Sequence, residues 1–214
     1  MAHAKRHNRM RTVGFADREL EYGEHLCALY DTPEERLRVL LAYVTAGLDN
    51  GHQVVYGAAR EQVNDLDKAL REAGKRPDVL AASGQLVYYT GQDLAEITAD
   101  FNPDVVIDVM KSGVRQAKAD GWPLVRFCGE MVNLVLNNPD HFARWVEYEG
   151  RLNYEFAGLP VILLCQYDRT KISGDLVASM IMSHPIVAFG DQVADNPYYV
   201  PPAHFPRPAA SDVV

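Results

Sequence analysis

Short runs of apolar residues alternate along this chain with longer segments whose apolar residues recur at every third or fourth position. The short runs are typical of buried strands, and the periodic segments are typical of helices that pack on a sheet with one face. Strands that alternate with helices are joined by right-handed crossovers and form a mainly parallel sheet. The sequence therefore predicts a three-layer α/β fold, in which helices cover both faces of a mainly parallel sheet.

The expected elements can be assigned by residue number. Strands are expected at 25–30, 54–56, 86–89, 124–128, 161–167 and 186–189. Helices are expected at 33–49, 63–73, 103–120, 139–156 and 176–182. The segment 103–120 contains a strand-like run, but its apolar residues keep helical spacing and Asn102-Pro103 supplies a cap and a first-turn proline. The run 161–167 is the most hydrophobic strand, and we expect it in the middle of the sheet.

The chain of 214 residues has the length of a single domain. Its first dozen residues carry positive charges and no negative one, so the net charge of −8 leaves the remainder strongly acidic. We expect a flexible basic arm over residues 1–19, one folded domain over 20–190, and an extended proline-rich strap over 191–214. The acidic body would repel phosphate groups, so we expect no direct contact with nucleic acid.

Cysteine spacing and hydropathy indicate a reducing environment away from membranes. The three cysteines lie far apart and include no Cys-x-x-Cys pair, which argues against a disulfide framework or a zinc ribbon. The N-terminus has no apolar stretch like that of a signal peptide, and no run approaches the roughly 18 apolar residues that span a membrane. We therefore expect a cytoplasmic protein that makes no membrane contact.

The turn between the first expected strand and the first expected helix is acidic. Thr32, Pro33 and Glu35 are typical of a helix N-cap, a first helical residue and the third residue of a capping box. An ATPase with this order of elements has a P-loop in this turn, with the pattern GxxxxGK[ST], whose backbone N–H groups and lysine hold the phosphates. No segment has that pattern, so we expect no nucleotide cofactor here.

Polar residues directly follow several of the expected strands. Tyr30 and Asp31 follow the first strand, Glu130 follows the fourth, and Tyr167 and Asp168 follow the fifth. Parallel sheets bind ligands beyond the carboxyl ends of their strands, so we expect these side chains to border one ligand site. The alternative is that each acid caps the helix that follows it.

His25 and Cys27 are two residues apart in an expected strand, so both side chains point to the same side of the sheet. Together with Cys165 and His184 they would supply the ligands of a soft metal ion. The alternative is burial in the core, where cysteine is common. We favour burial, so no resident metal is predicted.

Glu149 lies on the apolar stripe of the expected helix 139–156, three residues from Val146 and from Leu152. A carboxylate that faces a core is costly unless it is paired. Glu149 could form a buried ion pair with an arginine such as Arg126, or it could line the ligand cavity. We favour the structural ion pair.

Several short motifs, taken in order, resemble a known family. They are His25-Leu-Cys27-Ala-Leu-Tyr30, Arg126-Phe-Cys-Gly-Glu130-Met131, Tyr148-Glu149-Gly-Arg-Leu-Asn153, Leu164-Cys165-Gln166-Tyr167-Asp168, His184-Pro185 and Asn196-Pro-Tyr-Tyr-Val-Pro-Pro202. In order and spread they resemble the MEDS domain, the methanogen/methylotroph, DcmR sensory domain. The resemblance implies a RecA/KaiC-like fold without the P-loop, in regulators that often carry a DNA-binding or histidine-kinase domain. It also implies a ligand site that includes His25 and Cys27 and senses small molecules, among them hydrocarbon derivatives.

The predicted function is that of a small-molecule sensor in signalling or transcriptional regulation. The expected ligand-binding residues are His25, Cys27, Tyr30, Glu130, Glu149, Cys165, Tyr167, Asp168 and His184. We expect output through a regulatory protein (a kinase, an anti-sigma-type protein or a DNA-binding protein) or through formation of a homo-oligomer, without enzymatic activity. Two alternatives stay open: a degenerate nucleotide-binding protein or enzyme that uses Glu130 and Asp168, and a metal-binding redox protein.

Overall fold

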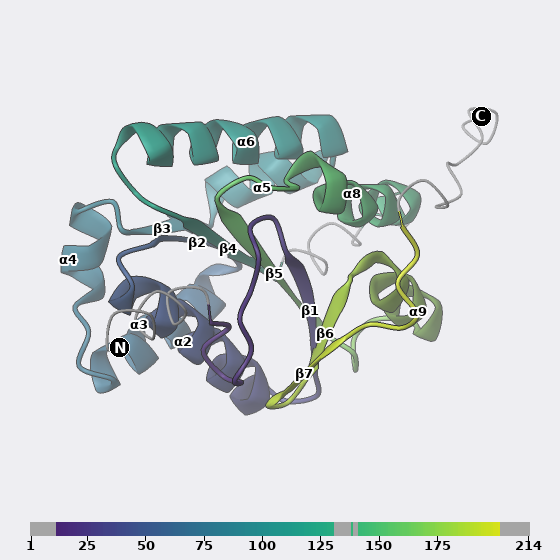
Figure 1. Cartoon of the computed structure of the whole chain (residues 1–214), viewed down its shortest axis with the longest axis horizontal. Helices are drawn as coiled ribbons and strands as arrows, with labels where there is room; N and C mark the ends of the chain where they lie inside the picture. Colours follow the sequence, from purple (N-terminus) through teal and green to yellow (C-terminus); the bar gives the residue numbers. More distant parts are fainter. Residues whose placement is uncertain (1–11, 131–137, 139–140, 202–214) are drawn as a thin grey trace, which may run out of the picture.

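A seven-stranded sheet forms the centre of the computed structural model, which describes residues 12–130, 138 and 141–201 (Figure 1). The strands are β1 (His25–Tyr30), β2 (Gln53–Gly57), β3 (Leu86–Tyr89), β4 (Val125–Gly129), β5 (Val161–Asp168), β6 (Ile186–Phe189) and β7 (Gln192–Asp195). Their order is β3-β2-β4-β5-β1-β6-β7, and all neighbours are parallel except β6 and β7. The mainly parallel sheet and the central position of β5 are confirmed.

Helices cover both faces of this sheet, which confirms the three-layer α/β fold (Figure 1). The helices α2 (Pro33–Asp49), α3 (Arg60–Glu72) and α4 (Pro77–Ala82) pack on one face, which we call the α2 face. The helices α5 (Gln92–Ala99), α6 (Pro103–Ala119), α8 (Phe142–Glu155) and α9 (Gly174–Ser183) pack on the other, which we call the α8 face. No helix in the described part of the chain is long and apolar enough to cross a membrane.

The capping residues begin the helices where the sequence predicts them. The Thr32 hydroxyl accepts a hydrogen bond from the backbone N–H of Glu35 at 3.2 Å, and the Asn102 side chain accepts one from Asp104 at 2.9 Å. These contacts satisfy N–H groups that a helix start leaves without partners. The segment 103–120 is therefore helical, as predicted.

Three short elements were not predicted: α4, α5 and β7. The helices α4 and α5 are too short to show a helical repeat, and β7 has a polar sequence at the beginning of the predicted strap. The strap therefore starts as an edge strand that pairs antiparallel with β6. Its end, at residues 202–214, and the beginning of the predicted helix 139–156 lie outside the described residues.

Packed structure begins before residue 20. Thr12 and Glu19 form an antiparallel bridge, and the side chains of Val13 and Leu20 are fully buried on the α2 face. The basic residues of the predicted arm, Lys5, Arg6, Arg9 and Arg11, lie outside the described residues. Residues 12–19 are thus part of the fold.

The alternation of side chains along each strand divides the interior into two cores. In β1, His25 and Cys27 face α8, whereas Leu26 and Tyr30 face α2. The strand β5 runs beside β1 in register, with Cys27 opposite Cys165, so its residues divide in the same way. This parity decides which of the predicted site residues can meet.

Arg126 does not pair with Glu149, so that prediction is wrong. The neighbours of Arg126 in β4 face α8, and Arg126 itself points to the α2 face, away from Glu149. Its guanidinium donates to His52 Nδ1 at 3.1 Å, to the Tyr43 carbonyl at 3.2 Å and to the Thr12 carbonyl at 2.7 Å. It also lies over the Tyr43 ring, 4.8 Å from the centroid. Arg126 therefore ties the N-terminal segment to the core.

Substitution of His52 by asparagine should make stability less dependent on pH. Burial, and then the nearby Arg126, lower the pKa of His52 to about 4. In the unfolded chain, the His52 imidazole has a pKa near 6.5. His52 therefore contributes stability above pH 6.5, and this contribution is lost as the pH falls towards 4. Between pH 7 and about pH 5 this loss should reach about 2 kcal/mol in the wild type.

Asparagine keeps an acceptor for Arg126 and does not titrate in this range. Urea unfolding at both pH values measures the difference between the two proteins. An equal loss of stability in His52→Asn and the wild type would contradict the assignment.

Candidate functional site

The predicted ligand-binding residues do not form one site, because they lie on opposite faces of the sheet. On the α8 face the structure places His25, Cys27, Glu149, Cys165, Tyr167 and His184. On the α2 face, at the carboxyl edge, it places Tyr30, Glu130 and Asp168. The first group lies beside an apolar cavity, and the second forms a separate network of ion pairs and hydrogen bonds.

The network at the carboxyl edge is centred on the buried carboxylate of Glu130. One carboxylate oxygen, Oε1, accepts hydrogen bonds from Tyr56 Oη at 2.7 Å and from Arg36 Nη1 at 3.1 Å. The other, Oε2, accepts from Tyr30 Oη at 3.1 Å and from the side-chain amide of Gln62. Glu130 and Arg36 are 3 % and 4 % exposed, so both charges of this ion pair are shielded from water.

This network occupies the position at which the alternative enzymatic function would require a free carboxylate. Every oxygen of Glu130 accepts two hydrogen bonds, and Arg36 also binds Asp65 at 2.8 Å. Burial lowers the pKa of Arg36, but Glu130, Tyr56 and Tyr30 together raise it by more, so the guanidinium stays charged. The arrangement is that of a structural ion pair, in which Glu130 holds α2 and α3 to the sheet.

The remaining acids of the carboxyl edge are bound to nearby residues. Asp168 accepts hydrogen bonds from the backbone N–H of Thr170 at 3.0 Å and from Lys171 Nζ at 2.9 Å. Asp31 forms an ion pair with Arg169 on the surface. Asp168 thus stabilises the turn that follows its own strand and does not cap α9, whose N-cap is Ser173.

On the α8 face, four metal-binding side chains from different elements meet in the interior. His25 Nε2 lies 3.2 Å from Glu149 Oε2 and 3.2 Å from Cys165 Sγ. His184 Nε2 lies 3.4 Å from the same Glu149 oxygen, and Cys165 Sγ lies 3.6 Å from it. All four donor atoms lie within 4.8 Å of one another. We call His25, Glu149, Cys165 and His184 the buried cluster.

The sequence predicted a different fourth member for this group. Cys27 is fully buried, but its sulfur is not among the clustered donor atoms, and Glu149 of α8 takes that place. Three of the four predicted metal ligands, His25, Cys165 and His184, therefore meet in the structure. The sequence suggested Glu149 only for an ion pair or for the cavity wall, because it does not show which elements pack beside α8.

Hydrogen bonds orient the members of the buried cluster from outside. His184 Nδ1 lies 2.6 Å from the Met180 carbonyl, and His25 Nδ1 lies 3.3 Å from Asn153 Oδ1. Tyr167 donates to the second oxygen of Glu149 at 2.5 Å. These contacts direct both Nε2 atoms and one carboxylate oxygen inwards.

Burial controls the protonation of the buried cluster. Burial, and then the charge of nearby His184, lower the pKa of His25 to about 4, so His25 is neutral at pH 7. Burial, followed by the negative charge of Glu149, raises the pKa values of Cys165 and Tyr167 well above their ordinary values. In the protein alone, the thiol and the phenol are therefore protonated and act as donors towards Glu149.

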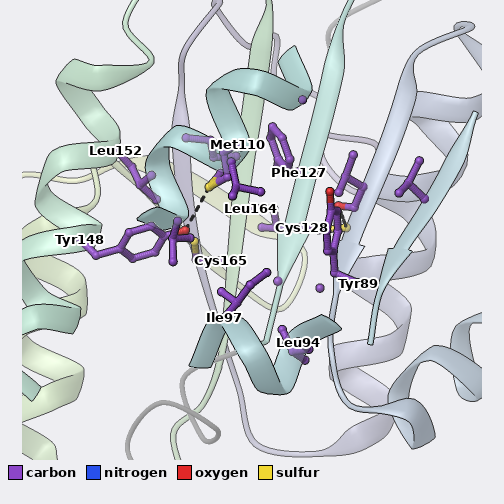
Figure 2. Close-up of a pocket in the computed structure, with 18 of the residues that line it drawn as sticks. Tyr89, Leu94, Ile97, Met110, Phe127, Cys128, Tyr148, Leu152, Leu164 and Cys165 are labelled. Atoms are coloured by element: carbon purple, nitrogen blue, oxygen red, sulfur yellow. Dashed lines mark hydrogen bonds between the residues drawn. The ribbon is translucent and has the colours of Figure 1, made fainter. Parts of the chain in front are cut away.

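A cavity of about 210 Å³ lies between the α8 face of the sheet and the helices α5, α6 and α8. In Figure 2, Leu94 and Ile97 of α5, Met110 of α6 and Tyr148 of α8 surround it. Apolar side chains form most of its wall: Val55, Val87, Leu94, Ile97, Val106, Val109, Met110, Phe127, Trp145, Leu152 and Leu163. Glu149, Cys165 and Tyr167 line it as well, so the buried cluster borders the cavity.

Sequence reasoning missed this cavity, although one signal was present. The apolar stripe of α6 carries Gly113 at a position where a larger side chain would fill the space. A Cβ atom added at Gly113 would meet only Phe127 Cζ, at 3.8 Å. Trp145 also lines the cavity, and its buried indole N–H has no hydrogen-bond partner among the described residues.

The chain is similar to proteins of known fold and to one curated regulator. Over 174 residues it is 26% identical to the transcriptional repressor DcmR of Methylorubrum extorquens, and the match covers 79% of this chain and 61% of DcmR. The chain thus spans less than two thirds of that relative's length.

Two solved structures share its fold at low sequence identity. The flagellar accessory protein FlaH of Methanocaldococcus jannaschii is 12% identical, with a TM-score of 0.57, over 90% of this chain and 82% of FlaH. A KaiC-like protein of Pyrococcus horikoshii OT3 is 15% identical, with a TM-score of 0.53, over 78% of this chain and 71% of that protein. Both likenesses confirm the RecA/KaiC-like fold.

The family model that matches the chain is MEDS, described as the methanogen/methylotroph, DcmR sensory domain, and it covers residues 24–185. That range includes every strand from β1 to β5, the buried cluster and the whole cavity wall. It ends at the residue that follows His184. The chain therefore belongs to the MEDS family of sensory domains.

Proposed function

We propose that this sensory domain binds a small organic molecule with a mainly apolar body, such as a hydrocarbon derivative, in the cavity between the sheet and α5, α6 and α8. The observation that supports this most directly is the wall of that cavity, which is mostly apolar with a few polar groups. Cavities of this kind bind small apolar ligands through the surface that binding removes from water, and the polar groups fix the orientation.

Two polar groups of the wall indicate what the ligand carries. The indole N–H of Trp145 is buried without a partner among the described residues, so it would gain a hydrogen bond from an acceptor on the ligand. Among the described residues, the Tyr148 hydroxyl donates to the thioether of Met110, a weak acceptor, at 3.3 Å. A hydroxyl, carbonyl or halogen on an apolar body would suit both donors, whereas a carboxylate would be buried next to Glu149.

The output of the sensor would pass to a regulatory protein or to a second copy of the chain in the cytoplasm. Similarity to a transcriptional repressor supports a role in regulation. The net charge of −8 disfavours direct contact with DNA, so a protein partner is the better candidate. The helices α5 and α6 form the outer wall of the cavity and would be the elements that respond first when it fills.

A thermal-shift series tests the proposal. Short-chain alcohols and halogenated alkanes should raise the melting temperature, and the matching carboxylates should not. A compound at 100 times its Kd should stabilise the protein by about 2.7 kcal/mol. In Trp145→Phe the shift should shrink for alcohols more than for halogenated alkanes, because an alcohol oxygen is a much stronger hydrogen-bond acceptor than a halogen. If no neutral compound of either class shifts the transition, the cavity is not a ligand site of this kind.

A further inference from the structure

We propose that His25, Glu149, Cys165 and His184 bind one divalent transition-metal ion, of which Zn²⁺ is the best match. The site would lie where Glu149 and Cys165 form part of the cavity wall. Nitrogen, sulfur and carboxylate oxygen are the donors that zinc takes in proteins. This inference does not depend on ligand binding in the cavity, since its ligand set and its tests concern the metal ion alone.

The tautomer of the neutral His184 ring directs a lone pair of Nε2 at the carboxylate of Glu149. The Met180 carbonyl can only accept a hydrogen bond, so His184 Nδ1 at 2.6 Å must carry the proton. In the neutral ring, Nε2 then presents a lone pair to Glu149 Oε2 at 3.4 Å. His184 Nε2 is fully buried and has no hydrogen-bond partner among the described residues. Two acceptors in this position repel each other unless a proton or a metal ion lies between them.

His25 presents the same arrangement. The amide nitrogen of Asn153 donates to the Ser183 carbonyl at 2.7 Å, which turns Asn153 Oδ1 towards His25 Nδ1 and makes Nδ1 the protonated nitrogen. His25 Nε2 therefore also faces Glu149 with a lone pair. The His25 and His184 ring centroids are 4.0 Å apart, so both rings direct Nε2 at the same carboxylate oxygen of Glu149.

The distances match a four-coordinate zinc site. With bonds of about 2.05 Å to nitrogen and about 2.3 Å to sulfur, ligand atoms in a tetrahedral zinc site lie about 3.3–3.6 Å apart. Four of the six donor separations in the buried cluster are 3.2, 3.2, 3.4 and 3.6 Å, and all six lie within 4.8 Å. Bound metal would also remove the thiol proton and convert Cys165 into a thiolate ligand.

The surroundings of the buried cluster have the features that support a metal site. Both outer imidazole nitrogens are held by oxygen acceptors, and the second Glu149 oxygen is held by Tyr167. The ligands come from β1, α8, β5 and the C-cap of α9, so the ion would cross-link four elements of the α8 face. Cys165 is only partly buried and borders the cavity, which provides a route for the ion.

Cobalt substitution tests the proposal and distinguishes the two nearby cysteines. The full chain, stripped with a chelator and titrated with Co²⁺, should bind one equivalent. It should show intense visible bands of tetrahedral cobalt and a thiolate-to-cobalt charge-transfer band. Cys165→Ala should lose the charge-transfer band. The matched control Cys27→Ala, altered at the residue opposite Cys165 in the neighbouring strand, should keep it.

The metal content of the wild-type protein gives a second readout that does not depend on any variant. Mass spectrometry of metals should find close to one zinc per chain after growth with zinc. Asn153→Ala should weaken zinc binding roughly 10- to 100-fold, because it releases the outer nitrogen of His25. Failure of the wild type to bind Co²⁺ or Zn²⁺ in equimolar amount would overturn the proposal. So would a charge-transfer band that survives in Cys165→Ala or disappears in Cys27→Ala.

Discussion

Replacement of Glu130 by glutamine should lower the free energy of unfolding by about 3–5 kcal/mol, the size expected when one partner of a buried ion pair is removed. The carboxylate balances the charge of Arg36, and both side chains are shielded from water. Glutamine removes that charge. Its NH₂ group would also face donors, because each carboxylate oxygen of Glu130 now accepts two hydrogen bonds. Equilibrium unfolding in urea measures the loss.

The matched control is Glu34→Gln, which removes the same charge from an exposed position in the first turn of α2. It should change the free energy of unfolding by no more than about 0.5 kcal/mol. A stable Glu130→Gln protein that has lost a binding or catalytic activity would contradict the account, because it would make Glu130 a functional carboxylate. Retained stability without any functional loss would contradict it equally, since the ion pair would then contribute nothing.

Replacement of Gly113 by leucine should abolish most ligand binding while leaving the fold intact. Gly113 lies in the wall of the cavity, and a side chain there would enter the space that the ligand needs. Leucine also favours the helix by up to about 1 kcal/mol relative to glycine. We therefore expect a protein at least as stable as the wild type whose affinity for neutral organic compounds is roughly 10- to 100-fold lower, the effect of an overpacking penalty of 1–3 kcal/mol.

Ser112→Leu supplies the control, because it adds the same side chain to the same helix at an exposed position. Its ligand-dependent thermal shift should equal that of the wild type. An unchanged shift in Gly113→Leu would place the ligand elsewhere. A shift lost in both variants would mean that leucine acts on α6 as a whole and not on the cavity.

The sequence determines the fold class to a large extent, because strand and helix periods and caps are local properties. The capped start of α6 at Asn102-Pro103 illustrates this: it distinguished a helix from a buried strand without tertiary information. The short helix α4 and the edge strand β7 could not be found in this way. Their stability depends on contacts with β3 and β6, which are properties of the assembled sheet.

The sequence indicated which types of residue lie near the candidate site, but it did not show which of them meet. Residues at the ends of parallel strands were expected to meet, but Tyr30 and Tyr167 point to opposite faces because their positions in the paired strands β1 and β5 differ by one step. The alternation of side chains between the two faces of each strand, applied to the paired strands, would have predicted that Tyr30 and Tyr167 lie on opposite faces. The same test would have separated Arg126 from Glu149. The volume of the cavity could not be predicted, because it depends on how α5 and α6 pack over the sheet.

The most direct test of the central claim, that a small apolar molecule binds between the sheet and α5, α6 and α8, is a methyl NMR titration of methionine-labelled protein. Met110 lines the cavity, whereas Met180 is buried in α9 and Met182 is exposed. The loss of one signal in Met110→Leu assigns the reporter among the six methionines. Titration with the neutral compound that gives the largest thermal shift should move the Met110 signal to saturation and leave that of Met182 in place. A Met110 signal that stays fixed while the compound still stabilises the protein would contradict the claim.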